Sequence, residues 1–231
     1  MAVAYSQNGV IVRGSGESGI IYKTDFSNYD YVNNIDYPII GNPTIFSSEY
    51  LSDFSISQSV IPYGNLNSAN ALSVGMNQNN DNARLNFTID LNGYKQVEFE
   101  LVLLILNSTT AMPTFLWFDN NMGLAVDNND SPPSRVLVST NYGKTNINVD
   151  STITSAGYYW LSNNTFYTKY ASNYKLLCDF ESNTMKFIHN NVPVVDVQNV
   201  PFVNNNLEFQ LSPRRTVNSI KIASIIVRKI Q

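Results

Sequence analysis

The chain has 231 residues, 43% of them apolar and 12% aromatic, so it can bury a full hydrophobic core and global disorder is excluded. Only 14% of the residues are charged, whereas neutral polar residues abound, with 33 Asn, 24 Ser and 14 Thr. The net charge is −4 and the basic residues are scattered, which excludes the concentrated positive surface that nucleic-acid binding requires. A single cysteine excludes an intrachain disulfide. Asn-rich breaks between apolar segments favour an all-β chain with many turns.

The N-terminal segment predicts a β-hairpin, because Asn8-Gly9 suits a tight turn between AVAYSQ and VIVR. A Gly- and Ser-rich break follows at residues 14–19. We therefore predict an N-terminal hairpin or arm over residues 1–19 and one β-sandwich domain over residues 20–231. A cationic segment followed by a long apolar run is missing at the start, so we expect no signal peptide.

The next part of the chain predicts less regular structure. Residues 27–43 contain Pro, Gly, Asn and several Tyr, which is typical of a long connection. Short helices are expected near residues 47–53 or 68–73.

A second Asn-Gly pair, Asn92-Gly93, predicts another hairpin, between RLNFTIDL and YKQVEFELVLLIL. Phe99, Leu101 and Leu103 alternate on one face of the second strand, so we expect them in a central strand against the other sheet. The opposite face begins with Glu98 and becomes apolar further on, which indicates a strand that passes into the interior.

Later segments alternate short apolar strands with Asn, Gly and Pro breaks, as in a sandwich rather than in alternating β and α elements. In the C-terminal third, YKLLCDF, MKFIH and VPVVDV are separated by turns at ESNT and Asn190-Asn191, and SIKIASIIVRKI closes the chain.

Residues 174–195 resemble the late strands of concanavalin A-like and laminin G-like jelly rolls. The resemblance is carried by Asp179-Phe180, by Met185–His189 and by the Asn-centred turn before Val192, with a closing strand over Ile220–Ile230. It implies an all-β fold, an antiparallel β-sandwich of jelly-roll type. Glycosidases of this fold carry Glu-x-Asp-x-x-Glu, whereas Glu98-Phe99-Glu100 is followed by Leu103 at the last acidic position. The acid that protonates the leaving group is missing, so we expect no enzyme activity.

The whole chain is also similar in style to virion proteins of tailed bacteriophages, with its Met-Ala-Val-Ala-Tyr start and its Asn-rich, weakly charged composition. This likeness implies a non-enzymatic structural subunit of a phage particle, such as a capsid decoration, a head fibre or a tail component. Its partners would be other virion proteins or copies of itself, and its location the virion, assembled in the host cytoplasm. The alternative is a lectin-like module that attaches to host-surface glycans. Neither nucleic acid nor membrane is an expected partner.

Residues that could carry catalysis are few. His189 is the only histidine, at a strand end beside two Asn, and we interpret it as a surface or turn residue rather than a base. Cys178 lies among apolar strand residues and is interpreted as a buried thiol. Glu98 and Glu100 lie on one strand face and could form a glycosidase pair, but a solvated outer face explains them better.

Three Asn- and Asp-rich loops, at residues 77–82, 119–121 and 127–130, could bind Ca²⁺ through carboxylate and amide oxygens. The best candidate ligands are Asp127, Asn129 and Asp130, although Asn and Asp are also typical turn residues. No other cofactor is expected.

Sugar binding on a β-sandwich uses exposed aromatic side chains beside amide and carboxylate partners. One cluster combines both kinds and gives the candidate glycan-binding residues Tyr158, Tyr159, Trp160, Asn163, Asn164 and Tyr167. Neighbouring strand residues face opposite ways, so only some can be exposed, and burial or protein contact explains the cluster equally well.

Overall fold

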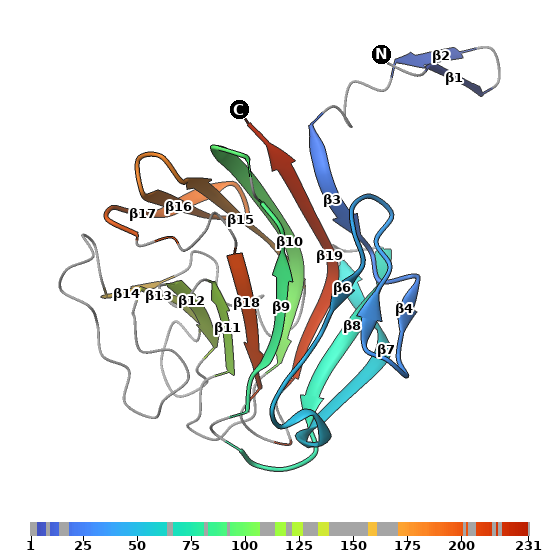
Figure 1. The fold of residues 1–231 in the computed structure, drawn as a ribbon, viewed down its shortest axis with the longest axis vertical. Helices are drawn as coiled ribbons and strands as arrows, with labels where there is room; N and C mark the ends of the chain where they lie inside the picture. Colours follow the sequence, from blue (N-terminus) through green and yellow to red (C-terminus); the bar gives the residue numbers. More distant parts are fainter. Residues whose placement is uncertain are drawn as a thin grey trace.

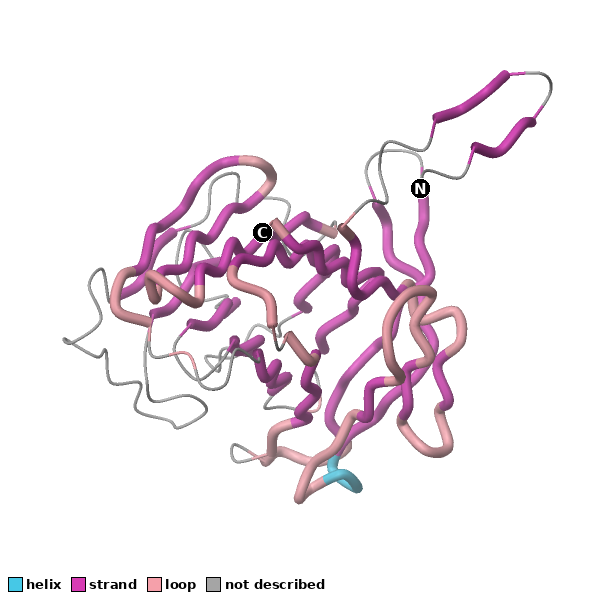
Figure 2. Tube along the Cα trace, turned by 45° about the horizontal axis from the view of Figure 1, so that its top comes forward, coloured by secondary structure: helices cyan, strands magenta, loops and turns pink. Residues whose placement is uncertain are grey.

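In the computed structural model the chain folds into antiparallel β-strands, and the described residues include one 3-10 turn (Figures 1 and 2). The structure describes residues 4–7, 10–13, 19–63, 67–80, 83–91, 93–106, 114–118, 122–126, 134–138, 157–160, 171–200, 202, 207–213, 216 and 219–230. The strands are β1 (Ala4–Gln7), β2 (Val10–Arg13), β3 (Ile20–Thr24), β4 (Tyr29–Asp30), β5 (Ile35–Asp36), β6 (Thr44–Ile45), β7 (Phe54–Tyr63), β8 (Asn67–Met76), β9 (Leu85–Ile89), β10 (Gln96–Leu106), β11 (Thr114–Phe118), β12 (Met122–Val126), β13 (Ser134–Val138), β14 (Gly157–Trp160), β15 (Ser172–Asp179), β16 (Thr184–His189), β17 (Val192–Val197), β18 (Leu207–Ser212) and β19 (Ser219–Lys229).

Two sheets face each other and enclose the core. The eight-stranded sheet has the order β17-β16-β15-β10-β19-β8-β7, and β3 pairs with β19 beside this path. The six-stranded sheet has the order β14-β13-β12-β11-β18-β9. In Figure 1 the six-stranded sheet lies against the curved larger sheet. This architecture confirms the antiparallel β-sandwich of jelly-roll, concanavalin A-like type that the sequence predicted.

The core forms where alternating apolar side chains from both sheets meet. Phe99, Leu101 and Leu103 are fully buried in β10, which lies between β15 and β19, so the predicted central strand is confirmed. Phe87 of β9 stacks on Phe209 of β18 with ring centroids 4.7 Å apart. Phe209 in turn lies 5.3 Å from Phe99, so this aromatic contact joins the two sheets.

The Asn92-Gly93 turn does not close a hairpin. The strands on either side of it lie in different sheets, because β9 pairs with β18 whereas β10 pairs with β15 and β19. Gly93 has a φ of 88°, and the Tyr94 amide donates to the Leu91 carbonyl at 3.1 Å. The turn therefore carries the chain across the core, and each strand presents its apolar face to that core from the opposite side.

Two further expectations for the N-terminal half are wrong. Residues 27–43 contain β4 and β5, which join β6 in a three-stranded sheet instead of a plain connection. Residues 68–73 belong to strand β8, because the alternation of that segment lets Leu72 and Val74 enter the core. Near residues 47–53 the structure has a single 3-10 turn, η1 (Leu51–Asp53).

The hairpin predictions elsewhere are confirmed. Asn190 and Asn191 have φ angles of 47° and 66°, as a tight turn between β16 and β17 requires. Strands β1 and β2 pair with each other in a two-stranded sheet of their own. The Asn8-Gly9 turn and residues 14–18 lie outside the described residues, and the arm stays a prediction.

The long β7–β8 hairpin covers part of the outer face of the larger sheet. Ile61 and Ala71 from this hairpin form a second buried cluster with Leu104 and Ala223. The Ala171 amide donates to the Pro62 carbonyl at 3.1 Å. This cover explains why the later part of β10 is apolar on both faces.

Among the described residues, no helix is long and apolar enough to cross a membrane.

Candidate functional site

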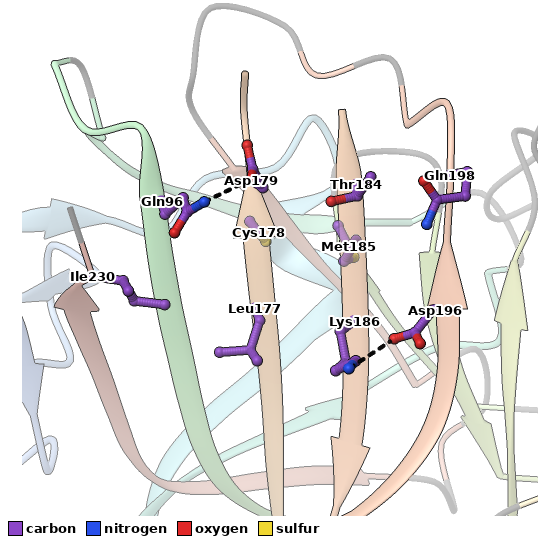
Figure 3. Close-up of a pocket in the computed structure, with 10 residues that line it drawn as sticks. All are labelled: Gln96, Leu177, Cys178, Asp179, Thr184, Met185, Lys186, Asp196, Gln198 and Ile230. Atoms are coloured by element: carbon purple, nitrogen blue, oxygen red, sulfur yellow. Dashed lines mark hydrogen bonds and ion pairs between the residues drawn. The ribbon is translucent and has the colours of Figure 1, made fainter. Parts of the chain in front are cut away.

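The uncovered part of the larger sheet presents a polar outer face (Figure 3). Strands β10, β15, β16 and β17 line a cavity of about 380 Å³ there, and the polar side chains around it are Gln96, Asp179, Thr184, Lys186, Asp196 and Gln198. The Gln96 amide donates to Asp179 at 2.7 Å, and Lys186 lies 3.4 Å from Asp196. Because these side chains already pair with each other, the face resembles an ordinary solvated sheet surface.

Glu98 and Glu100 lie on this same outer face, where Arg228 holds both carboxylates. The Arg228 guanidinium donates to Glu98 at 3.0 Å and to Glu100 at 2.6 Å. Burial disfavours ionisation of Glu100, but hydrogen bonds from Arg228 and Asn173 outweigh it and lower the pKa of its carboxyl. A glycosidase acid needs a raised pKa, so the arrangement does not fit a catalytic pair. The two carboxylates lie on the outer face as predicted, but they are part-buried against Arg228 rather than fully solvated.

His189 is fully buried, so its interpretation as a surface or turn residue is wrong. It follows Met185 and Phe187 on the inner face of β16, and its ring lies 4.9 Å from that of Tyr174. Burial lowers the pKa of His189 to about 4, so the imidazole is neutral at physiological pH. Cys178 is buried as predicted.

A trough lies between β6 and β9, and its polar lining side chains are mostly neutral. Its wall is held by a bridge between Ser47 and Asn86, whose backbone amides donate to each other's carbonyls at 2.9 and 2.7 Å. At one end a cavity of about 370 Å³ is lined by Pro43, Thr44, Ile45, Ser47, Asn86, Phe87 and Thr88. A second cavity of about 300 Å³ continues from it and shares Pro43, Thr44 and Thr88. Its other lining residues are Ile21, Tyr22, Gly41, Asn42, Ile89, Asp90 and Tyr94.

The wall on the β6 side is fixed by a buried carboxyl group beneath it. Asp36 is fully buried, accepting hydrogen bonds from Tyr22 at 2.6 Å and from Thr24 at 2.9 Å. Burial raises the pKa of Asp36 despite these bonds. Asp36 also pairs with Thr44 in the ladder of β5 and β6, so this network sets the position of the trough wall.

The trough offers hydrogen-bonding groups and almost no charge. Among the described lining residues, Asp90 is the only Asp, Glu, Lys or Arg, and Thr44, Ser47 and Thr88 supply hydroxyl groups. The side-chain carbonyl oxygen of Asn86 is buried and has no hydrogen-bond partner among the described residues. A buried acceptor without a partner is costly, so this oxygen is suited to a ligand hydroxyl.

Sequence reasoning did not find this trough. The polar positions Asn86, Thr88 and Asp90 alternate with the apolar core positions of β9, and this alternation was the available signal. The opposite wall depends on the three-stranded sheet, which the sequence did not predict. The contact between β6 and β9 joins segments that are about 40 residues apart.

The aromatic residues predicted for glycan binding lie partly in β14, at the edge of the six-stranded sheet. In the ladder with β13, Tyr158 pairs with Leu137, Tyr159 with Val136 and Trp160 with Arg135. Tyr158 and Trp160 therefore share one face of the sheet, and Tyr159 takes the other. Asn163, Asn164 and Tyr167 lie outside the described residues, so the predicted cluster stays a prediction.

The predicted calcium ligands Asp127, Asn129 and Asp130 also lie outside the described residues, as do residues 119–121. In the loop at 77–80, Asn77 donates to the Phe54 carbonyl at 3.0 Å and Asn80 to Asp53 at 2.6 Å, as turn residues do. Within the described part of the chain, no three His, Cys, Asp or Glu side chains are grouped to hold a metal ion.

Comparison with known proteins identifies a shared fold but no sequence family. No protein-family model and no curated protein sequence matches the chain. Among solved structures, the carbohydrate recognition domain of Emp47p is similar over 94% of this chain and 99% of its own, with 14% identity and a TM-score of 0.46. A carbohydrate esterase of Shiga toxin-encoding bacteriophage phi24B is similar over 80% of this chain and 90% of its own, with 10% identity and a TM-score of 0.49.

A third structure, that of HCR/D-Sa-GBL1/C, is similar over 92% of this chain and 49% of its own, with 11% identity and a TM-score of 0.50. At this level of identity the likeness concerns the fold alone.

Proposed function

We propose that the protein is a non-enzymatic, carbohydrate-binding β-sandwich and that the trough between β6 and β9 binds a neutral glycan. The observation that carries this proposal is the unpartnered side-chain carbonyl of Asn86 in a cavity of sugar-binding chemistry. A sugar hydroxyl can donate to this oxygen and accept from Thr or Ser hydroxyls beside it.

The chemistry of the trough favours a neutral sugar over a charged ligand. A phosphate or carboxylate would need basic partners, and no Lys or Arg occurs among the described residues that line the trough. The Tyr94 ring and the apolar Pro43 and Ile45 can cover the non-polar faces of a sugar ring. Ile45 is 62% exposed, so it can contact a ligand without prior rearrangement.

The same structure supports binding without catalysis. Glu98 and Glu100 are neutralised by Arg228, and both lie on the larger sheet rather than in the trough. The only histidine is buried in the core. Asp90 is the only Asp or Glu among the lining residues that the structure describes, and glycoside hydrolysis ordinarily requires two carboxyl groups.

A glycan array with the intact chain tests the proposal. We expect binding to a set of neutral glycans, and an affinity that falls about tenfold or more in Asn86→Ala, because a hydrogen bond and its geometry are lost. Asn173→Ala is the matched control, because Asn173 also has an unpartnered side-chain carbonyl but lies on the other sheet. A protein that binds no glycan on the array would overturn the proposal.

We also propose a second function, which is the one favoured by the sequence: the protein is a structural subunit of a phage particle and binds other virion proteins. It is favoured by an apolar surface around the three-stranded sheet, where Tyr31, Val32, Tyr37, Ile39, Ile45, Tyr50 and Leu51 are all exposed. Exposed apolar side chains that gather in one segment are typical of protein contacts. The native mass of the particle or oligomer tests this role, and a monomer that does not bind purified phage particles would contradict it.

A further inference from the structure

We infer that the free edge of β7 joins two copies of this chain, with each β7 pairing antiparallel with that of its partner about a two-fold axis at Gln58. The two eight-stranded sheets then form one continuous sheet. The inference is independent of glycan binding, because no β7 residue is among the described residues that line the trough.

Strand β7 is the last strand of the larger sheet and pairs there with β8 alone (Figure 1). Its ten residues keep one uninterrupted register with β8, without a bulge. Residues 54–63 contain no Asp, Glu, Lys or Arg, and the only proline, Pro62, lies near the end. Soluble proteins normally protect their edge strands with charges, bulges or prolines. A long edge without this protection is suited to strand addition.

The backbone groups that point away from β8 belong to the even-numbered residues of β7. The Asn77 amide donates to the Asp53 carbonyl at 2.7 Å, which extends the ladder with β8 by one position. Alternate residues of an antiparallel strand bond to the same neighbour, so the odd-numbered residues bond towards β8. The amides and carbonyls of Ile56, Gln58 and Val60 therefore point outward, and no described residue bonds to them.

Both ends of this open stretch are closed. At one end, the Phe54 amide donates to the Leu51 carbonyl, and the Phe54 carbonyl accepts from the Asn77 side chain at 3.0 Å. At the other end, Pro62 has no amide hydrogen to donate, and its carbonyl accepts from the Ala171 amide at 3.1 Å. The edge is therefore open at Ile56, Gln58 and Val60.

A second β7 matches this open stretch in one register. With the axis at Gln58, the two Gln58 residues lie opposite each other, and Ile56 lies opposite the partner's Val60. Each such pair exchanges both of its backbone hydrogen bonds. A shift of the axis leaves at least one of the three residues opposite a closed position, so this register alone pairs all of them.

The side chains of the three residues are also self-complementary. They share one face of the strand, on which Ile56 packs partly against the core. Val60 is 56% exposed although it is apolar, and Gln58 is exposed as well. Pairing places Val60 against the partner's Ile56 and brings the two Gln58 amides together, so the contact buries apolar surface and requires no charge.

A copy of this chain offers more contact than an isolated strand does. Tyr50 and Leu51 lie just before β7 and are exposed. Antiparallel pairing brings them beside the end of the partner's β7, where Pro62 is exposed. The contact stays smaller than a standard protein interface, so we expect a reversible dimer.

Sedimentation equilibrium of the intact chain tests this inference. We expect the mass to rise with concentration from 25.9 kDa towards twice that value. Gln58→Lys places two ammonium groups opposite each other and should weaken the dimer about tenfold or more. Gln198→Lys is the control and should behave like the wild type. It makes the same substitution at an exposed position directly after β17, at the far edge of the same sheet.

A charge exchange tests the position of the axis. Gln58→Glu should also be weakened when it is alone, because two carboxylates then face each other. An equal mixture of Gln58→Lys and Gln58→Glu should restore the dimer, because opposite charges face each other in the mixed pair. This recovery requires that Gln58 lies opposite itself.

A wild-type chain that remains monomeric at about 0.5 mM would overturn the inference, since even weak specific pairs form at that concentration. A dimer that persists unchanged in Gln58→Lys would do so too. Deletion of residues 1–18 removes the predicted arm, which would act in larger assemblies, and should leave the pair intact. Loss of the pair on this deletion would assign the contact to the arm instead. Gln58→Pro removes the outward amide without adding charge, and it decides the question if a charged variant does not fold.

Discussion

Protonation of His189 should account for a large part of the acid instability of this protein. The imidazole is fully buried beside Tyr174, and burial lowers its pKa from 6.5 to about 4. In the unfolded chain the pKa returns to its ordinary value. Between these two values the unfolded state binds more protons than the folded state, so the stability falls as the pH falls.

The two pKa values determine the size of the effect. At pH 7 the stability contributed by this site is almost fully present, because the ordinary pKa lies below that pH. From pH 7 to pH 5 we expect a loss of about 2 kcal/mol, and from pH 7 to pH 4 a loss of about 3 kcal/mol. Such a loss is a large share of the total stability of a typical domain.

Urea unfolding at pH 7, 5 and 4 measures this effect when the wild type is compared with His189→Phe. Phenylalanine keeps an aromatic ring against Tyr174 but cannot take up a proton. The carboxyls with lowered pKa, such as those of Asp179 and Glu100, also lose stability in acid, but they do so in both proteins and cancel in the difference. A variant with the same pH dependence as the wild type would refute the argument.

Three other predictions concern the core, catalysis and assembly. Leu101→Ala should cost about 2–5 kcal/mol in urea unfolding because the side chain is fully buried, and a loss under about half a kcal/mol would contradict its place in the central strand. No β-glucan or galactan cleavage is expected, and cleavage that disappears in Glu98→Gln would restore the glycosidase interpretation. Deletion of residues 1–18 should leave the sandwich folded but weaken incorporation into a particle or oligomer by removing a strand-pairing arm. A rise in salt from about 0.05 to 0.5 M should weaken assembly much less, since few charges take part, and normal assembly of the truncated chain would argue against the arm.

The core strands could be predicted from the sequence because their apolar residues alternate strictly. Leu85, Phe87 and Ile89 alternate in β9, and Phe99 and Leu101 do so in β10, so the two strands were correctly identified. Their partners were not, because Asn-Gly suits any turn that needs a positive φ angle, whether it closes a hairpin or joins two sheets. Only long-range pairing, which local pattern does not encode, distinguishes the two.

The burial of His189 was also contained in the pattern. Met185, Phe187 and His189 alternate on one face, and that face is the core face. The neighbouring Asn190 and Asn191 favoured a surface interpretation instead, because they mark a turn. The turn begins directly after His189. The two Asn residues therefore marked the turn correctly, and the alternation of the strand correctly indicated that the His189 side chain faces the core.

The candidate site was less accessible to sequence reasoning than the fold. The Asn86 side of the trough lies on a strand that the sequence predicted, but the opposite side comes from residues 42–47, whose pairing depends on the buried Asp36 network. Tyr158 was a candidate from composition alone. Its place in β14, at the edge of the six-stranded sheet, depends on pairing with β13, and no local pattern specifies that pairing.

A crystal structure with the best oligosaccharide from the array bound would test the central claim most directly. We predict a sugar ring in the trough between β6 and β9, with a hydroxyl within hydrogen-bond distance of the Asn86 side-chain oxygen. A glycan bound instead on the polar face of the larger sheet, beside Asp179 and Lys186, would contradict it.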